Sequence, residues 1–108
     1  MQSEIKINVT LDANKIPEKI SWTAQGMEDE EAKDASAFLL SIWDPGENNM
    51  LRIDLWTKDM TVDEMKQFYY QAFITMSETF ERATGEKEIT KQMVDFAEYF
   101  AEKMGLIQ

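Results

Sequence analysis

The chain of 108 residues contains no cysteine and no histidine. Without thiols it forms no disulfide and offers no thiolate to a metal. The lack of imidazole also removes serine–histidine triads, cysteine–histidine dyads and nearly all zinc chemistry. Carboxylate chemistry, a lysine nucleophile and magnesium held by acids are the catalytic options that remain. We therefore expect a protein that is not an enzyme and that binds no metal or cofactor.

Glycine and proline are also scarce, with four and two residues, so most of the chain should lie in regular elements. The glycines, at positions 26, 46, 85 and 105, fall at expected turns or helix ends, and none belongs to a phosphate-binding loop. Hydrophobic residues make up 44% and charged residues 30%, a balance typical of globular proteins. At this length we predict one domain, residues 1–108.

Positive charge is in short supply, because 11 basic residues face 21 acidic ones and leave a net charge of −10. Such a field repels phosphate backbones and disfavours nucleic-acid binding. No apolar run approaches the roughly 20 residues that span a bilayer. The start, "MQSEIKINVT", lacks the basic and apolar regions of a secretory signal. We expect a soluble cytoplasmic protein without direct membrane insertion, whose partners are proteins.

Two strands are predicted near the start of the chain. Apolar and polar residues alternate over residues 5–11 and again over residues 19–24, the period of a half-buried strand. "DAN" at residues 12–14 has the composition of a turn. Residues 25–34 are expected to form a loop, because Glu28 to Glu31 repel one another. A calcium site there is the alternative, but the run lacks the spaced ligands and central glycine of an EF-hand loop.

A hairpin follows, in which "ASAFLLSIWD" and "MLRIDLWTK" flank the turn "PGENN". The apolar pattern fixes its register, since a slip by one residue would exchange the two faces. One face is then continuously apolar and directed to the core, and the other carries Arg52, Asp54 and Trp56. The predicted pairs are Ile42 with Leu51, Leu40 with Ile53, Phe38 with Leu55, Ser41 with Arg52, Leu39 with Asp54, and Ala37 with Trp56.

Two helices complete the chain. Thr61 and Glu64 form a capping box that starts the first helix, and Gly85 can close it in the left-handed conformation. The second helix is expected from about Lys87 to Met104, and Gly105 ends it. The apolar stripes are expected at Met65, Phe68, Tyr69, Ala72, Met76, Phe80 and Ala83 in the first helix, and at Ile89, Met93, Phe96, Ala97, Phe100 and Met104 in the second.

The sequence therefore predicts an α+β fold of order β-β-β-β-α-α, a four-stranded antiparallel sheet with both helices packed on one face. Two sets of residues exceed what the core of a monomer needs. Tryptophan and arginine, which are enriched at interfaces, lie on the reverse face of the sheet, and apolar residues lie off the stripe of the first helix. The candidate interface residues are Trp43, Arg52, Asp54, Trp56, Tyr70 and Ile74.

Several segments resemble the GldC family, small soluble proteins associated with gliding motility in bacteria of the Bacteroidetes type. The resemblance covers the chain apart from residues 25–34. The most specific segments are "LRIDLWTKDM" at residues 51–60 and "VDEMKQF" at residues 62–68. The others are "SEIKI", "PEKISW", "LSIWD", "ETFERAT" and "YFAEKM". The resemblance implies an accessory role in the gliding apparatus, whose parts overlap with the type IX secretion system, and it implies no catalytic residues.

The leading interpretation is a non-enzymatic interaction module that forms a homo-oligomer, a dimer or tetramer, and contacts gliding or secretion components. The alternative is a holdase chaperone similar to SecB, based on the predicted β₄α₂ order and the acidity, an analogy of fold alone. An enzyme that uses Arg52 and Asp54 would need a concave pocket at that pair. A carrier with a small ligand between sheet and helices is also open, although the sequence offers no polar anchors for one.

Overall fold

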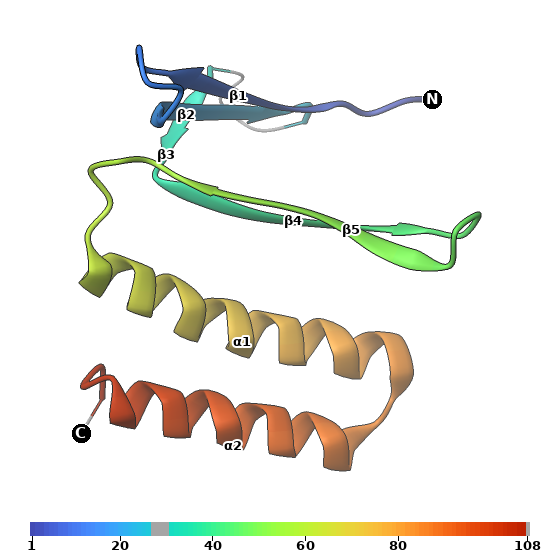
Figure 1. Cartoon of the computed structure of the whole chain (residues 1–108). Helices are drawn as coiled ribbons and strands as arrows, with labels where there is room; N and C mark the ends of the chain where they lie inside the picture. The colour runs from blue at the N-terminus through green and yellow to red at the C-terminus, as the bar shows by residue number, and fades with distance from the viewer. Residues whose placement is uncertain (27–30, 108) are drawn as a thin grey trace. The chain divides into compact units, whose positions relative to one another are not determined.

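The computed structural model describes residues 1–26 and 31–107 and divides into two compact units, Met1–Met60 and Thr61–Gln108. Figure 1 shows the elements of both units. The first unit contains β1 (Ile5–Leu11), β2 (Pro17–Ala24), β3 (Lys33–Ala35), β4 (Ala37–Asp44) and β5 (Asn49–Trp56). The second contains α1 (Val62–Thr84) and α2 (Lys87–Lys103). The predicted α+β class, antiparallel strands followed by two helices, is confirmed.

The predicted single four-stranded sheet is wrong, because the described strands number five and form two sheets. β1, β2 and β3 form one antiparallel sheet in that order, and β4 pairs with β5 in the other. In the first sheet Ile7 lies opposite Trp22 and Val9 lies opposite Ile20, so the alternating apolar residues share one face as predicted. Ile20 is 1% exposed and forms the centre of that face.

β3 is the strand that the sequence did not predict. Residues 25–34 were expected to be a loop, yet Lys33 pairs with Trp22 and Ala35 with Ile20. Lysine, aspartate and alanine have low strand propensity and show no apolar alternation, so the sequence carries no signal for this strand. The backbone of β2 supplies its partner instead. Ser36 alone separates β3 from β4, and there the chain passes from one sheet to the other.

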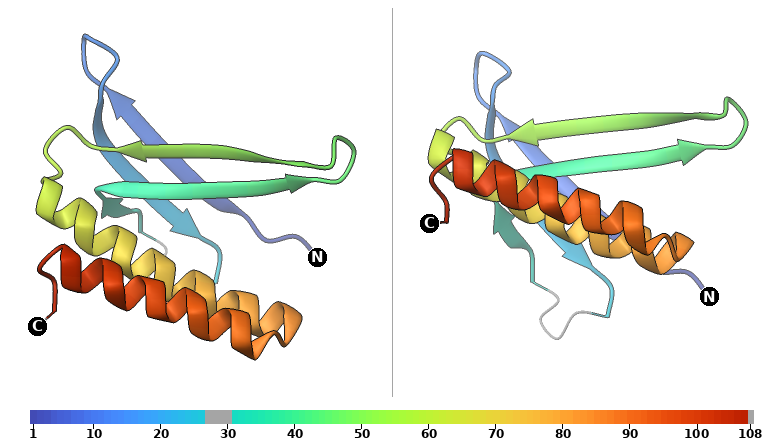
Figure 2. Two further views of the ribbon diagram at one scale, coloured as in Figure 1. Left: turned by 60° about the horizontal axis from the view of Figure 1, so that its bottom comes forward. Right: turned by 90° about the horizontal axis from the view of Figure 1, so that it is seen from below.

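The β4–β5 hairpin has the predicted register at all six pairs. Asp44 Oδ1 accepts a hydrogen bond of 2.9 Å from the Gly46 amide and so fixes the turn, and Asn48 takes the left-handed conformation at φ 55°. β4 and β5 lie side by side throughout, and their turn lies away from the three-stranded sheet (Figures 1 and 2). At the other end, the hairpin is anchored by hydrogen bonds from the Thr57 amide to the Ser36 carbonyl, 2.8 Å, and from the Lys58 amide to the Pro17 carbonyl, 3.0 Å.

Both ends of α1 follow the predicted signals. The Thr61 hydroxyl accepts from the Glu64 amide at 3.1 Å, and the Glu64 carboxylate accepts from the Thr61 amide at 3.0 Å, which completes the capping box. Gly85 adopts φ 72°, and its amide donates to the Glu81 carbonyl at 2.8 Å. Gly105, at φ 75°, follows the end of α2.

The predicted apolar stripes of the helices are partly wrong. α1 and α2 run side by side and pack on each other (Figure 2), and their fully buried side chains are small: Ser77, Thr90, Ala97 and Ala101. Small side chains let two helices approach closely, which displaces larger ones from the contact line. The large residues that the stripes assigned to the core but that are exposed are Tyr69, Met76, Ile89, Phe96 and Met104.

Candidate interaction surface on the β4–β5 hairpin

One face of the hairpin, here called the tryptophan face, carries the predicted interface residues of the first unit. It consists of Ala37, Leu39, Ser41 and Trp43 of β4 and Met50, Arg52, Asp54 and Trp56 of β5. Trp43 is 60% exposed and Trp56 is 55% exposed. Trp56 pairs with Ala37, six residues along β4 from Trp43, so the indoles lie about 20 Å apart along the strands. The structure therefore puts both predicted tryptophans on one open face, at its two ends.

Arg52 and Asp54 occupy the middle of the tryptophan face and bind each other. The guanidinium donates through Nε to Oδ2 at 3.0 Å and through Nη2 to Oδ1 at 3.1 Å, a two-pronged pair. Their side chains are 37% and 33% exposed, so the pair contributes at most ~1 kcal/mol to folding. The tryptophan face therefore carries an indole at each end, Trp43 and Trp56, and a charged pair between them.

The opposite face, here called the leucine face, consists of Phe38, Leu40, Ile42, Leu51, Ile53 and Leu55. A cavity of about 190 Å³ joins Phe38 to the apolar face of the three-stranded sheet, where its lining includes Ile20 and Trp22. Further along the hairpin, Ile42, Leu51 and Ile53 are each about half exposed. The three-stranded sheet thus covers only the Phe38 end of a face that the sequence assigned wholly to the core.

Tyr70 and Ile74 belong to the second unit, where they lie one turn apart on α1. Both are half-buried. They form a second candidate surface, separate from the tryptophan face, and the structure gives them less exposed area than it gives the two tryptophans.

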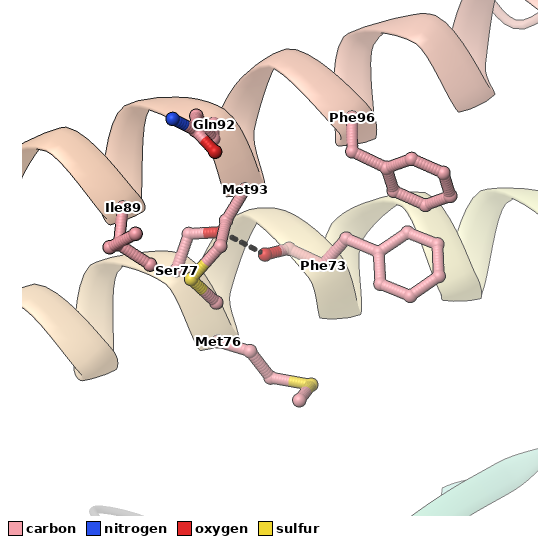
Figure 3. Close-up of a pocket in the computed structure, with 7 residues that line it drawn as sticks. All are labelled: Phe73, Met76, Ser77, Ile89, Gln92, Met93 and Phe96. Carbon is pink, nitrogen blue, oxygen red and sulfur yellow. Dashed lines mark hydrogen bonds between the residues drawn. The ribbon is translucent and has the colours of Figure 1, made fainter.

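A groove between the helices was missed at the level of sequence. Its volume is about 390 Å³, and its large apolar residues come from both helices (Figure 3). The Ser77 hydroxyl donates to the Phe73 carbonyl at 2.7 Å, so its polar hydrogen is satisfied and the lining is almost wholly apolar. The predicted stripes contained four of these side chains, Met76, Ile89, Met93 and Phe96, but assigned them to the core. The lining residues are Phe73, Met76, Ser77, Ile89, Gln92, Met93 and Phe96.

The described residues contain no group of three or more acidic side chains placed to hold a metal ion. A calcium site was the alternative to a solvated loop at the acidic run. Of that run, Glu28, Asp29 and Glu30 lie outside the described residues. No helix in residues 1–26 and 31–107 is long and apolar enough to cross a membrane.

A salt bridge holds the two sheets of the first unit together at the base of the hairpin. Asp12 Oδ1 accepts from the amides of Asn14 and Ile16, at 2.8 and 3.0 Å, and Oδ2 accepts from Lys58 Nζ at 3.1 Å. The Ile16 amide is the main reason that the pKa of Asp12 lies below its ordinary value of 3.8, and Lys58 lowers it further. The hydrogen bond to Asp12 in turn raises the pKa of Lys58. One carboxylate therefore fixes the β1–β2 turn and ties it to the residues that follow β5.

Replacing Asp12 with asparagine is expected to make stability less dependent on pH in acid. Because folding lowers the pKa of Asp12, its carboxylate stabilises the fold fully above pH 3.8, and this contribution is lost as the pH falls through the folded pKa. The variant lacks this titration. Urea unfolding at pH 7 and pH 3 should show a difference between wild type and Asp12→Asn that shrinks at the lower pH. An equal difference at both pH values would contradict the prediction.

Comparison with known proteins identifies the family. A search of the curated proteins and of the solved structures gave no significant match to the chain. The model of the family described as gliding motility-associated protein GldC-like matches residues 17–106, from the first residue of β2 to beyond the end of α2. The matched region includes the whole β4–β5 hairpin and both helices. Since the match spans most of the 108 residues, the chain belongs to the GldC-like family of gliding motility-associated proteins.

Proposed function

We propose that this protein is a non-enzymatic accessory component of the gliding and type IX secretion machinery, which self-associates and binds other proteins through the β4–β5 hairpin. The observation that carries the proposal is the exposure of large apolar side chains on both faces of one hairpin. Those that are about half exposed or more are Ile42, Trp43, Met50, Leu51, Ile53 and Trp56.

The area is large enough for recognition. Three large side chains on each face, each exposing about 100 Å², give roughly 300 Å² of apolar surface per face, which is within the range of the largest apolar patch of a typical monomer, a patch that is often functional. Trp43, Trp56 and Arg52 are of the residue types that contribute most to binding energy at protein interfaces. A hairpin of two strands also gains little stability alone in water, so a bound partner stabilises it.

The Arg52–Asp54 pair favours binding over catalysis. The guanidinium donates to both oxygens of the carboxylate, at 3.0 and 3.1 Å, on the face of a two-stranded sheet. Both oxygens of the carboxylate accept from the guanidinium, so neither is directed at a substrate proton, as a general base must be. The same pair suits an interface, where it orients the arginine on the face that also carries Trp56.

The experiment is an affinity pull-down from a native host lysate, analysed by mass spectrometry, with wild type and the double variant Arg52→Ala/Trp56→Ala. Wild type should recover gliding or secretion components. Loss of these two contacts on the tryptophan face is expected to reduce the recovery about 30-fold or more, since hot-spot truncations each cost ~2 kcal/mol or more. The thermal unfolding midpoint should change little, because Trp56 is 55% exposed and the Arg52 side chain 37%.

A matched control removes an arginine and an exposed aromatic residue from the second unit. Arg82→Ala/Tyr99→Ala truncates an exposed arginine on α1 and a 55% exposed tyrosine on α2. Recovery of the same partners by this control and by wild type, but not by Arg52→Ala/Trp56→Ala, supports the proposal. Equal recovery by all three proteins would refute the role of the tryptophan face.

A holdase chaperone similar to SecB is the second candidate, and the groove between α1 and α2 favours it. The groove is open and lined mainly by methionine and phenylalanine, side chains that adapt to varied apolar segments. A holdase should suppress the aggregation of an unfolded client at near-equimolar ratio, and Met76→Glu in the groove should abolish the effect. Unchanged client aggregation in the presence of wild type would eliminate this candidate.

A further inference from the structure

β4 has an unprotected edge. Among the described residues, β4 pairs with β5 and with no other strand, so the backbone groups along its other side have no strand partner. From Ala37 to Trp43 the strand contains no charge, no proline and no glycine. Natural edge strands are usually protected by such residues, by bulges or by short length. β4 has eight residues in regular register, and its one charge, Asp44, is at its last position.

We propose that this edge pairs antiparallel with the β4 edge of a second copy of the chain, with Leu40 on the two-fold axis. The inference rests on the self-association part of the proposed function and names the surface that carries it. The product is a four-stranded sheet in the order β5-β4-β4-β5, which removes the exposed edge of both copies.

The sequence of β4 is complementary to itself in this register. Residues opposite each other in an antiparallel pair share a face, so Leu40 meets Leu40 and Phe38 meets Ile42 on the leucine face. On the tryptophan face, Ala37 meets Trp43 and Leu39 meets Ser41. Every pair on the leucine face is apolar. No pair on the tryptophan face brings like charges together.

Charge and sheet stability also favour a second copy as the occupant. The one charge of β4, Asp44, falls opposite the uncharged Ser36, so the paired strands bring no two charges together. A four-stranded sheet also has the independent stability that a two-stranded one lacks.

Single cysteines test the register directly, because the chain has none of its own. Leu40→Cys should form a disulfide-linked dimer on mild oxidation, since directly opposed residues lie within the 4.4–6.8 Å Cα separation of a disulfide. Ile53→Cys is the matched control. Ile53 pairs with Leu40 on the same face, but its two copies would lie three strand spacings, about 14 Å, apart. We expect at least fivefold more linked dimer from Leu40→Cys.

A second pair of cysteine variants tests the same register with Leu40 intact, so the test does not depend on whether Leu40→Cys folds. Leu39→Cys mixed with Ser41→Cys should link the two different chains, whereas Ser41→Cys alone should link poorly. Sedimentation of wild type at micromolar concentration separates the two hypotheses. A mass above the 12.6 kDa monomer without linkage at positions 39–41 overturns the β4 edge and leaves self-association standing. A monomer overturns both, and preferential linkage of Ser41→Cys to itself overturns the register.

Discussion

Replacing Ile20 with alanine is expected to lower the free energy of unfolding by about 3 kcal/mol. Ile20 is 1% exposed and is the largest apolar side chain with so little exposure in the part of the chain that the structure describes. It lies between Val9 on β1 and Ala35 on β3, so its side chain joins all three strands of the sheet. Removal of three carbon atoms there leaves a cavity that a three-stranded sheet cannot close by a small shift.

Tryptophan fluorescence is the measurement, because all three tryptophans lie within residues 1–60. Ile16→Ala is the control, since it deletes the same atoms from a residue that is 45% exposed, and it should cost less than about 1 kcal/mol. Equal losses in the two variants would show that Ile20 is not the centre of this core. If residues 1–108 form one cooperative domain, circular dichroism of the helices at 222 nm should shift together with the fluorescence.

The β4–β5 hairpin shows what the sequence could predict. Alternation of apolar residues on two strands leaves one register that keeps each face uniform, and this register is the observed one. The ends of α1 were predictable for a similar reason: Thr61, Glu64 and Gly85 act on backbone groups a few residues away. Features that depend on local hydrogen bonds or on strict periodicity can be predicted from a single sequence.

The missed features depend on contacts between distant residues. β3 exists because β2 supplies a partner to a segment with little strand propensity, and that pairing cannot be read from Lys33 to Ala35 alone. The inward face of each helix was misjudged because a 3.6-residue stripe identifies apolar residues and not the line of closest approach. Ser77 and Thr90 are polar by type, yet they are buried where the helices come close.

The candidate surface was predictable in part. The alternation of Arg52, Asp54 and Trp56 predicts that they share a face, and the structure places Trp43 on that face as well. The extent of exposure was not predictable, because it depends on which other elements cover the hairpin, and alternation along the two strands does not show this. The groove between the helices was hidden for the same reason: its side chains look like core residues until their exposure is known.

The helix pair leads to the second large effect, which is expected when Ala97 is replaced with leucine. Ala97 is fully buried on α2, and Ala101, one turn later, is fully buried as well. Three more carbon atoms have no space there, so α2 must move away from α1 or take a strained rotamer. Overpacking of this kind costs about 2 kcal/mol, and leucine and alanine have similar helix propensities, so helix formation itself is not the cause.

Circular dichroism at 222 nm during thermal and urea unfolding measures the loss, and Ala83→Leu is the matched control. Ala83 lies in the last turn of α1 and is exposed, so the same change there should alter the free energy of unfolding by no more than about 0.5 kcal/mol. The movement of α2 should also widen the groove that contains Phe73 and Phe96, whose ring centroids are 5.5 Å apart. An Ala97→Leu variant as stable as wild type would mean that the helices are not held together by close approach on small side chains. Packing of the large residues around Phe73 would then be their main attachment.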